Sequence, residues 1–312
     1  MMEDLTEEKI KETGGPAPIR LVSLLALLCL GVFVLFSFSE HRFSSAKQIN
    51  SEPQIILPPA PVLSAHAYLV QIIGDSKPIL KQRAWKPLPP ASITKLITAL
   101  LARELFSENT EIIISKEAKA VGEKISKLEV GTSMRRDEAI KAMLVESAND
   151  IAYATGEVVA MQADPYVENK KQILADMMNA KAKMLGMAHT SLLNPTGLDE
   201  EGHKTSAEDL FLLSQYLWYN DPWVWEITRN SEATVFTDRG EYTAVSTNVL
   251  LQEFPALRGG KTGLTDAAKG TLVLLYPLRN GKTAIVIILG SDDRFEDGRK
   301  IIHWLDSAFP EQ

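Results

Sequence analysis

Hydrophobic residues follow three patterns along this chain of 312 residues: one long apolar run, several stretches with helical spacing, and several β-rich runs. The long run, LVSLLALLCLGVFVLFSFS at 21–39, carries no charge. Its nineteen residues, at about 1.5 Å of helical rise each, nearly match a bilayer core of ~30 Å. The run therefore predicts an N-terminal transmembrane helix that acts as a signal-anchor.

The segments on either side of this run have different compositions. Residues 1–20 are polar and charged and predict a cytoplasmic tail, whereas 40–63 contain four prolines and predict an extended linker. The length of the run favours an uncleaved anchor, since the apolar region of a signal peptide usually has roughly 7–15 residues. The basic residues on the two sides of the run slightly favour an N-terminus on the cytoplasmic side of the membrane. We expect a single-pass cell-membrane protein whose folded domain, 64–312, is extracytoplasmic.

Within 64–312, β-rich runs at both ends enclose a largely helical middle. AHAYLVQII and PILKQ flank the turn signal GDSKP and predict a hairpin at 65–82. Apolar residues at helical spacing predict helices at 92–105, 137–147, 171–185, 206–218 and 295–309. Further β-rich runs lie at 232–238, 241–247, 269–278 and 283–290. The expected fold class is α/β (α+β), an antiparallel sheet flanked by helices, with strands from both chain ends.

The helix predicted at 92–105 also carries a candidate for chemistry. Its spacing predicts a buried core face made of Leu96, Ile97, Leu100, Leu101 and Leu105. Ser92 and Lys95 share a face because residues three apart do, and they could form a nucleophile and its base. Alone the pair is weak, since S-x-x-K is expected by chance roughly once in such a chain and also occurs at 44–47. A capping serine and a surface lysine are the ordinary alternatives.

Composition narrows the classes of function. The net charge of −7 and the lack of a basic stripe argue against a nucleic-acid partner. The only cysteine, Cys29, lies in the apolar run, so no disulfide is expected. No Cys/His cluster has metal-ligand spacing, and we expect no cofactor. The five histidines are interpreted as surface or packing residues.

Two motifs further along the chain supply possible partners for Ser92 and Lys95. Ser147-Ala148-Asn149 matches S-x-N near a predicted helix end, and Lys261-Thr262-Gly263 is the single K-T-G in the chain. S-x-N also occurs at 107–109 and 246–248, but each of these copies lies about fifteen residues from another motif. S-x-x-K, S-x-N and K-T-G in this order are the signature of penicillin-recognising serine enzymes. The three motifs together are a far more specific signal than any one of them alone.

Five sequence blocks together resemble a known family. They are PPASITKLITAL, LVESANDIAYA, MNAKAKMLGMAHTSLLNPTGLDEEGH, STNVLL and GGKTGLTDAAKGTLV, and they extend over about 62–292. They are similar to the low-molecular-mass D-alanyl-D-alanine carboxypeptidases, which are penicillin-binding serine peptidases of peptidoglycan metabolism. The resemblance implies the α/β fold shared with serine β-lactamases. It also implies peptidoglycan stem peptides as substrates, an acyl-serine intermediate, and β-lactam antibiotics as inhibitors.

The catalytic roles follow from the resemblance together with the chemistry of the residues. Ser92 would be the nucleophile, and Lys95 could take its proton only in the neutral form. Burial and the positive charge of Lys261 would both favour that form. Ser147 could relay a proton to the leaving amine, and Asn149 could bind a substrate amide or hold Lys95.

The K-T-G stretch supplies the expected substrate-binding residues. Lys261 and Thr262 offer a cation and a hydroxyl to a terminal carboxylate, and Gly263 leaves space for an extended peptide. By resemblance, the backbone N–H groups of Ser92 and Leu264 would form the oxyanion hole. Relatives often have histidine at the position of Leu264, so a side-chain contact to the substrate would differ here.

Other functions use parts of the same signature. A D,D-endopeptidase that cleaves peptidoglycan cross-links would need the same residues. A β-lactamase would need a deacylation device, and no glutamate-bearing omega-loop motif can be placed between Asn149 and Lys261. A non-catalytic wall-binding protein would not need the complete set of polar residues. Asn194-Pro195 and Gly197 are interpreted as a turn.

Overall fold

The computed structural model describes residues 57–163, 166 and 168–310. The predicted tail at 1–20, the predicted anchor at 21–39 and most of the predicted linker at 40–63 lie outside the described residues. Among the residues that are described, none of the helices is long and apolar enough to cross a membrane. Residues 56–312 form one compact unit, which is described here by itself.

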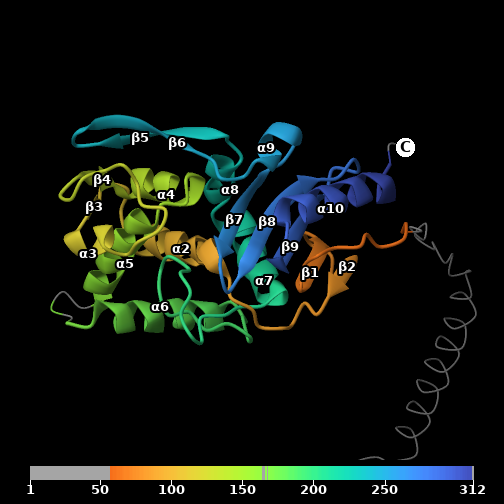
Figure 1. Ribbon diagram of the computed structural model, residues 1–312, viewed down its shortest axis with the longest axis horizontal. Coiled ribbons are helices and arrows are strands. Elements are labelled where there is room, and N and C mark those ends of the chain that lie inside the picture. The colour runs from red at the N-terminus through yellow and green to blue at the C-terminus, as the bar shows by residue number, and fades with distance from the viewer. Residues whose placement is uncertain (1–56, 164–165, 167, 311–312) are drawn as a thin grey trace, which may run out of the picture. The chain divides into compact units, whose positions relative to one another are not determined.

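A five-stranded antiparallel sheet forms one half of this unit (Figure 1). Its strand order is β2-β1-β9-β8-β7. The strands are β1 (Ala67–Ile72), β2 (Leu80–Gln82), β7 (Gly259–Thr265), β8 (Lys269–Pro277) and β9 (Thr283–Ser291). β1 pairs with β9, from Ala67 opposite Leu289 to Ile72 opposite Ala284. The expectation that the sheet combines strands from both chain ends is confirmed.

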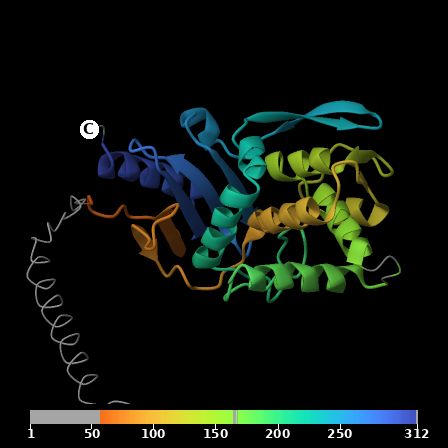
Figure 2. The same cartoon turned by 180° about the vertical axis from the view of Figure 1, so that it is seen from behind.

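Alternating residues of the central strands build a separate hydrophobic core on each face of the sheet. Leu272, Leu274, Val286 and Ile288 face α10 (Arg294–Ala308), which lies over β8 and β9 (Figure 1). Val273, Leu275, Ile285 and Ile287 join the core on the other face, where α7 (Ala207–Asn220) lies (Figure 2). Both faces are therefore covered, which explains why these strands are apolar throughout.

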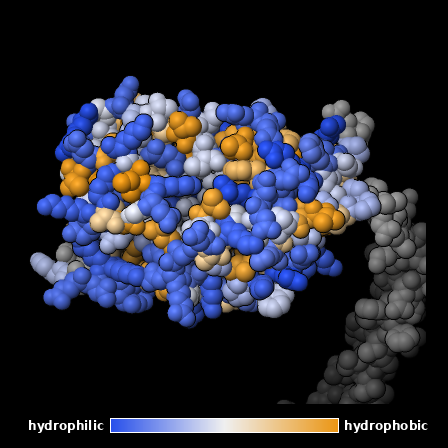
Figure 3. Space-filling model, viewed as in Figure 1, coloured by the Kyte–Doolittle hydropathy of each residue, from blue (hydrophilic) through white to orange (hydrophobic). Residues whose placement is uncertain are grey.

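The other half of the unit is mainly helical. Its central helix is α2 (Lys95–Leu105), which begins directly after the 3-10 turn η1 (Ala91–Thr94). Around it lie α3 (Lys116–Lys119), α4 (Arg136–Val145), α5 (Asn149–Ala163) and α6 (Lys170–Met184). The remaining helices are α8 (Trp223–Thr228) and α9 (Leu250–Glu253). On the face shown in Figure 3, hydrophobic residues are scattered among hydrophilic ones.

The helix predicted at 92–105 ends at Leu105 as expected, but its start and the burial of its last residue differ from the prediction. Ser92 lies in η1, so it is not the cap of an α-helix. Leu105, expected in the core, is 39% exposed, whereas the next residue, Phe106, is 6% exposed. The chain leaves the helix at Phe106 in an extended conformation, and this side chain takes the core position that the helical spacing assigned to Leu105.

The helix predicted at 137–147 ends earlier, and another helix follows it. α4 ends at Val145, and α5 begins at Asn149 after Ser147 has turned the chain with a φ of +65°. α5 was not predicted because polar and small residues such as Asp150 and Thr155 are buried on it beside apolar ones. This burial weakens the alternation between an apolar and a polar helix face on which the prediction depends.

Two β-rich runs form their own ribbon instead of joining the main sheet. β5 (Glu232–Thr237) pairs only with β6 (Gly240–Val245) among the described strands, and β3 (Glu111–Ile113) with β4 (Ser133–Arg135) forms a second small ribbon. The fifth strand of the sheet is β7, which contains the K-T-G motif. Because this strand contains three glycines and a lysine, its hydrophobicity pattern does not indicate a strand.

Truncating Leu100 should destabilise the protein far more than truncating Leu105. Leu100 is 1% exposed in the centre of α2, and a buried leucine changed to alanine typically lowers the free energy of unfolding by ~2–5 kcal/mol. For Leu105→Ala we expect a loss below ~1 kcal/mol. Urea titrations of the two variants and the wild type measure the difference. Equal losses would contradict the assignment of the two side chains.

Candidate active site

Lys95 is held at the centre of the site by three oxygen atoms. Its Nζ lies 2.8 Å from Ser92 Oγ, 2.6 Å from Asn149 Oδ1 and 2.7 Å from the backbone oxygen of Thr196. The side chain is fully buried. The three contacts come from η1, from the first residue of α5 and from the turn at 194–197.

These three partners can hold a neutral lysine in position to receive a proton. The oxygens of Asn149 and Thr196 can only accept hydrogen bonds, so they use two N–H groups of the amine. Ser92 is the single partner of the three with a proton to give, and a neutral amine has one lone pair left to receive it. In the neutral form the lone pair of Lys95 is therefore directed at the hydroxyl of Ser92, whereas an ammonium group would donate to all three oxygens.

The electrostatics of the site favour the neutral form of Lys95. Burial of Lys95 lowers its pKa well below the usual value, and the positive charges of Lys261 and Lys124 lower it further. The carboxylate of Asp150 opposes this shift. Asp150 itself accepts hydrogen bonds from Lys119 and from the backbone and side chain of Ser126. Its charge is thus largely engaged by these groups.

Ser147 and Asn149 come from the tight link between α4 and α5. Ser147 is buried, and its Oγ accepts a hydrogen bond of 3.0 Å from Lys261 Nζ. The backbone N–H of Asn149 donates to the oxygen of Lys124, and its side-chain amide donates to the oxygen of Glu123. The amide oxygen of Asn149 is thereby oriented toward Lys95.

Strand β7 places the K-T-G residues along the other side of the site. Lys261 is buried, and its Nζ also donates to the backbone oxygen of Thr262 at 2.8 Å. Burial, together with the positive charges of Lys124 and Arg294, lowers the pKa of Lys261 to about 7. The hydroxyl of Thr262 is 2.6 Å from that of Thr247.

Gly263 allows β7 to approach Ser92 closely. A Cβ atom at this position would lie 2.3 Å from Thr271 Oγ1 and 2.9 Å from the backbone nitrogen of Ser92. Both distances are shorter than contacts that a side chain tolerates. The next residue, Leu264, is 49% exposed, so its side chain lies at the rim of the site.

The structure brings together the residues that the sequence selected. Hydrogen bonds join Lys95 to Ser92 and Asn149. A second group of hydrogen bonds joins Lys261 to Ser147 and to the backbone oxygen of Thr262. The two groups are coupled by the charge of Lys261 acting on Lys95. Gly263 packs against the backbone of Ser92, and Leu264 follows it on β7. Their catalytic and binding roles remain predictions.

Four neighbours of the site were missed by the sequence analysis. Thr196 contributes a backbone oxygen, which has no side-chain signature, and Thr247 lies inside an S-x-N match that the analysis set aside. Lys124 and Arg294 act through their charges from distant parts of the chain. Thr196 and Thr247 both belong to blocks that resemble the family, MNAKAKMLGMAHTSLLNPTGLDEEGH and STNVLL, which is the one sequence signal that pointed to them.

The segment 194–197 forms the expected turn and also holds the lysine. Asn194 Oδ1 accepts hydrogen bonds from the backbone N–H groups of Thr196 and Gly197. Gly197 has a φ of +83°, and a Cβ atom there would lie 1.8 Å from the backbone oxygen of Ala91. The turn can therefore pack directly under η1 only with glycine at this position.

One histidine supports this arrangement without reaching the reacting atoms. Leu193 N–H donates to His203 Nδ1, so the proton of the neutral ring lies on Nε2, which is 2.9 Å from Thr94 Oγ1. Burial lowers the pKa of His203 to about 4. The ring is therefore neutral near pH 7 and acts as a packing residue, as predicted.

Comparison with known families identifies this arrangement. Residues 57–293 match the sequence profile of peptidase family S11, described as D-alanyl-D-alanine carboxypeptidase. The chain belongs to this family. It is thus a member of a family of peptidases, and the family resemblance stated from the sequence is confirmed.

Individual relatives agree with this assignment. D-alanyl-D-alanine carboxypeptidase DacF of Bacillus subtilis is 31% identical over 292 residues, covering 92% of this chain and 70% of the relative. A D-alanyl-D-alanine endopeptidase of Escherichia coli is 26% identical over 295 residues, covering 92% and 89%. The structure of penicillin-binding protein D2 from Listeria monocytogenes in its ampicillin-bound form has a TM-score of 0.64 and 31% identity, covering 79% and 99%.

Replacing Lys261 by methionine should change how stability depends on pH. With a folded pKa of about 7 and an ordinary value of 10.5, unfolding binds a proton at Lys261 between these two pH values. The free energy of unfolding should therefore rise with pH in this window, because the unfolded state holds more protons.

The measurement compares urea unfolding of wild type and Lys261→Met from pH 7 to 9.5. We expect the stability of the wild type relative to the variant to increase steadily with pH. Replacement of the exposed Lys204 by methionine serves as the control. The free energy of unfolding of this variant should depend on pH as that of the wild type does. A constant difference between wild type and Lys261→Met would contradict the lowered pKa.

Proposed function

We propose that this protein is a serine-type D-Ala-D-Ala carboxypeptidase that removes the terminal D-alanine of peptidoglycan stem peptides through an acyl-Ser92 intermediate. The observation that carries the proposal is the contact of 2.8 Å between Lys95 Nζ and Ser92 Oγ, with two pure acceptors around the same amine. Membership of the D-alanyl-D-alanine carboxypeptidase family supports the substrate class.

Acylation would begin at Ser92. As its oxygen attacks the carbonyl carbon of the penultimate D-alanine, the hydroxyl proton passes to the lone pair of Lys95. The negative charge on the carbonyl oxygen is stabilised by the backbone N–H groups of Ser92 and Leu264. The carbon–nitrogen bond then breaks, and the proton taken up by Lys95 passes to the leaving amine through Ser147, whose hydroxyl is hydrogen-bonded to Lys261.

Deacylation reverses these roles with water in place of the amine. Lys95 removes a proton from the water that attacks the ester carbon, and Ser92 recovers its proton when the ester bond breaks. Asn149 keeps the amine of Lys95 in position through both halves of the reaction. The products are the shortened peptide and free D-alanine.

The cationic groups beside Ser147 would explain why the enzyme prefers substrates with a terminal carboxylate. Lys261 and Thr262 offer it an ammonium group and a hydroxyl, and the positive charge of Arg294 acts on the same place. Arg294 Nε is buried and has no hydrogen-bond partner in the described part of the chain. β-Lactams carry a carboxylate beside their reactive carbonyl, so we propose that they acylate Ser92 as inhibitors.

The alternatives use the same catalytic residues but fit less well. A D,D-endopeptidase remains the second candidate, since a relative in Escherichia coli carries that name. A β-lactamase ranks third, because no carboxylate among the described residues hydrogen-bonds to Ser92 or Lys95. A non-catalytic wall-binding protein ranks last, because it would have no need for a buried lysine directed at a serine.

The location of the enzyme is also a proposal. The uncharged run at 21–39 supports a single-pass anchor in the cytoplasmic membrane, with the proline-containing segment 40–63 between membrane and enzyme. The peptidase domain would then face its peptidoglycan substrate outside the cytoplasm.

A muropeptide with a pentapeptide stem should lose one alanine when incubated with a soluble form that begins at Pro61. Mass spectrometry measures the loss, and Ser92→Ala should abolish it. Ser107→Ala, in the unused S-x-N match, is the matched control and should retain activity. No loss from a folded protein would overturn the carboxypeptidase assignment, and release of monomers from cross-linked dimers would establish the endopeptidase.

The full chain expressed in bacteria should sediment with membranes and resist extraction by high salt, because an apolar helix is held by the bilayer and not by charge. Deleting residues 1–60 should release it into the soluble fraction. Immunoblots of the fractions measure this. A full chain found in the soluble fraction at its full mass would contradict the anchor.

A further inference from the structure

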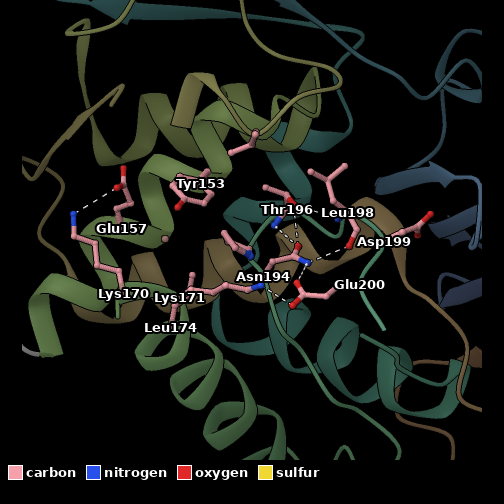
Figure 4. Close-up of a pocket in the computed structure, with 13 residues that line it drawn as sticks. Tyr153, Glu157, Lys170, Lys171, Leu174, Asn194, Thr196, Leu198, Asp199 and Glu200 are labelled. Carbon is pink, nitrogen blue, oxygen red and sulfur yellow. Dashed lines mark hydrogen bonds and ion pairs between the residues drawn. The ribbon is translucent and has the colours of Figure 1, made fainter. Parts of the chain in front are cut away.

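Two cavities beside the active site differ in how their charged side chains are paired. The larger one, of about 250 Å³, lies along α5 and α6 (Figure 4). Figure 4 shows that carboxylates at its rim have lysine partners, Glu157 with Lys170 and Glu200 with Lys171. The smaller cavity, of about 190 Å³, is lined by Lys124, whose ammonium group has no such partner in the described part of the chain.

The smaller cavity opens beside the K-T-G motif, at the end of the site where the carboxylate of the leaving D-alanine would bind. Lys124 and Ile125 line one wall, and Ala148 and Thr247 line others. Thr247 Oγ1 is 2.6 Å from Thr262 Oγ1, the hydroxyl that we propose as a ligand of this carboxylate. Lys124 therefore faces the K-T-G residues from a different wall, which belongs to the helical half of the domain.

The backbone around Lys124 is strained and held in place by the active site itself. Gly122, Glu123 and Lys124 have successive φ values of +76°, +47° and +31°. Such a run is costly for residues other than glycine and persists only where neighbouring groups hold it. Asn149 does so, because its backbone N–H donates to the oxygen of Lys124 at 2.9 Å and its side-chain amide to that of Glu123 at 3.2 Å. The residue that orients Lys95 thus also positions Lys124.

Asp150 ties the same segment to α5 on both sides of Lys124. This carboxylate is fully buried and accepts hydrogen bonds of 2.7 Å from Lys119 Nζ and of 2.9 and 2.7 Å from the backbone N–H and the hydroxyl of Ser126. Lys119 also donates to the backbone oxygen of Ser126. The backbone of Lys124 is therefore fixed against the active site, although its side chain is exposed at the cavity mouth.

Three cationic side chains gather at this end of the site. The positive charge of Arg294 acts on Lys124, and both charges act on Lys261. Partial burial of Lys124 and the charge of Arg294 lower the pKa of Lys124. The carboxylates of Glu123 and Asp293 oppose such shifts at Lys124 and Arg294, but both are exposed, so solvent screens them. Repulsion among three neighbouring cations is relieved when an anion binds between them.

The carboxylate of the smaller cavity does not supply this anion. Glu146 lines the cavity but accepts a hydrogen bond of 2.8 Å from the hydroxyl of Tyr242. Burial raises the pKa of Glu146, and the lysines whose charges act on it are Lys127 and Lys119. The ammonium group of Lys124 is therefore left to interact with a ligand.

We propose that Lys124 is a specificity-determining residue whose ammonium group binds the free carboxylate of the leaving residue. The carboxylate lies between Lys124 on the helical side and the hydroxyl and cations already described on the side of β7. Its charge relieves the repulsion among the cations. The inference rests on the proposed carboxypeptidase function and names a further residue through which the same site selects its substrate.

This arrangement separates leaving groups by their charge. An amine that leaves together with a free carboxylate, as D-alanine does, gives the cations a shared partner. An amidated residue gives them none, and it loses the charge-assisted hydrogen bonds. The enzyme should therefore release free amino acids in preference to amidated ones and to amines that carry no carboxylate.

Two synthetic peptides test the role of Lys124 with the full chain in detergent. One is Nα,Nε-diacetyl-L-lysyl-D-alanyl-D-alanine, and the other is the same peptide with a C-terminal amide. Chromatography with mass detection measures the release of D-alanine or D-alaninamide. We expect Lys124→Met to lower kcat/KM for the free carboxylate roughly tenfold, mainly through a higher KM, and to change the value for the amide less than about twofold.

Matched variants separate carboxylate binding from a structural role. Lys124→Arg keeps the positive charge and should retain most of the preference for the free carboxylate. Lys127→Met removes a nearby exposed lysine and should leave both values of kcat/KM unchanged. Circular dichroism reports whether each variant is folded, and Lys124→Gln replaces Lys124→Met if the latter fails to fold.

The outcomes for Lys124 and for the proposed function are distinguishable. If folded Lys124→Met keeps the wild-type ratio of the two kcat/KM values, whether both are unchanged or both fall equally, the carboxypeptidase stands and the role of Lys124 is overturned. A wild type that cleaves both peptides equally well also overturns it. If the wild type releases no D-alanine, the proposed function itself fails and the inference fails with it.

Discussion

The site depends on burying the amine of Lys95 where it cannot easily carry a charge. An isolated ammonium group in such a place is costly, and the protein meets this cost by favouring the neutral form. Burial and the neighbouring positive charges lower the pKa, while two pure acceptors hold the amine without supplying a negative charge. The groups that hold it, from η1, α5 and the turn at 194–197, could not be moved independently. Their positions follow from the core around α2.

Backbone strain gathers around the same residues. Ala91, Ser147, Glu123 and Lys124 all have positive φ values, although none of them is glycine. Such conformations cost of order 1–3 kcal/mol each and persist only where the surrounding structure determines them. Ala91 precedes Ser92, and the other three lie at or beside the link to α5. The packed helices on either side thus offset the strain that places Ser147 and the amide oxygen of Asn149.

The sequence predicted which side chains come together in the site better than it predicted the local structure. The three motifs selected the residues that meet around Lys95, because side-chain types at fixed spacing leave a readable signal. The sheet with strands from both chain ends and most of the helices were also predictable from hydrophobic spacing. The strand that carries Lys261 was not, because three of its seven residues are glycines, of which Gly263 permits the close approach to Ser92. The oxygen of Thr196 and the charge of Arg294 were beyond reach, since a backbone atom leaves no pattern and a charge acts through space.

Because β1 pairs with β9, the candidate site can form only after nearly the whole domain has been synthesised. Ser92 is made early, but strand β7, which brings Lys261 and Gly263 to it, belongs to the last part of the domain. That strand is held in place through β8 and β9, and the sheet closes only when β9 meets β1. Contacts between such distant segments form late in folding. A partly emerged chain therefore contains Ser92 without the residues that surround it in the folded domain, and the candidate site is assembled only when the whole domain has folded.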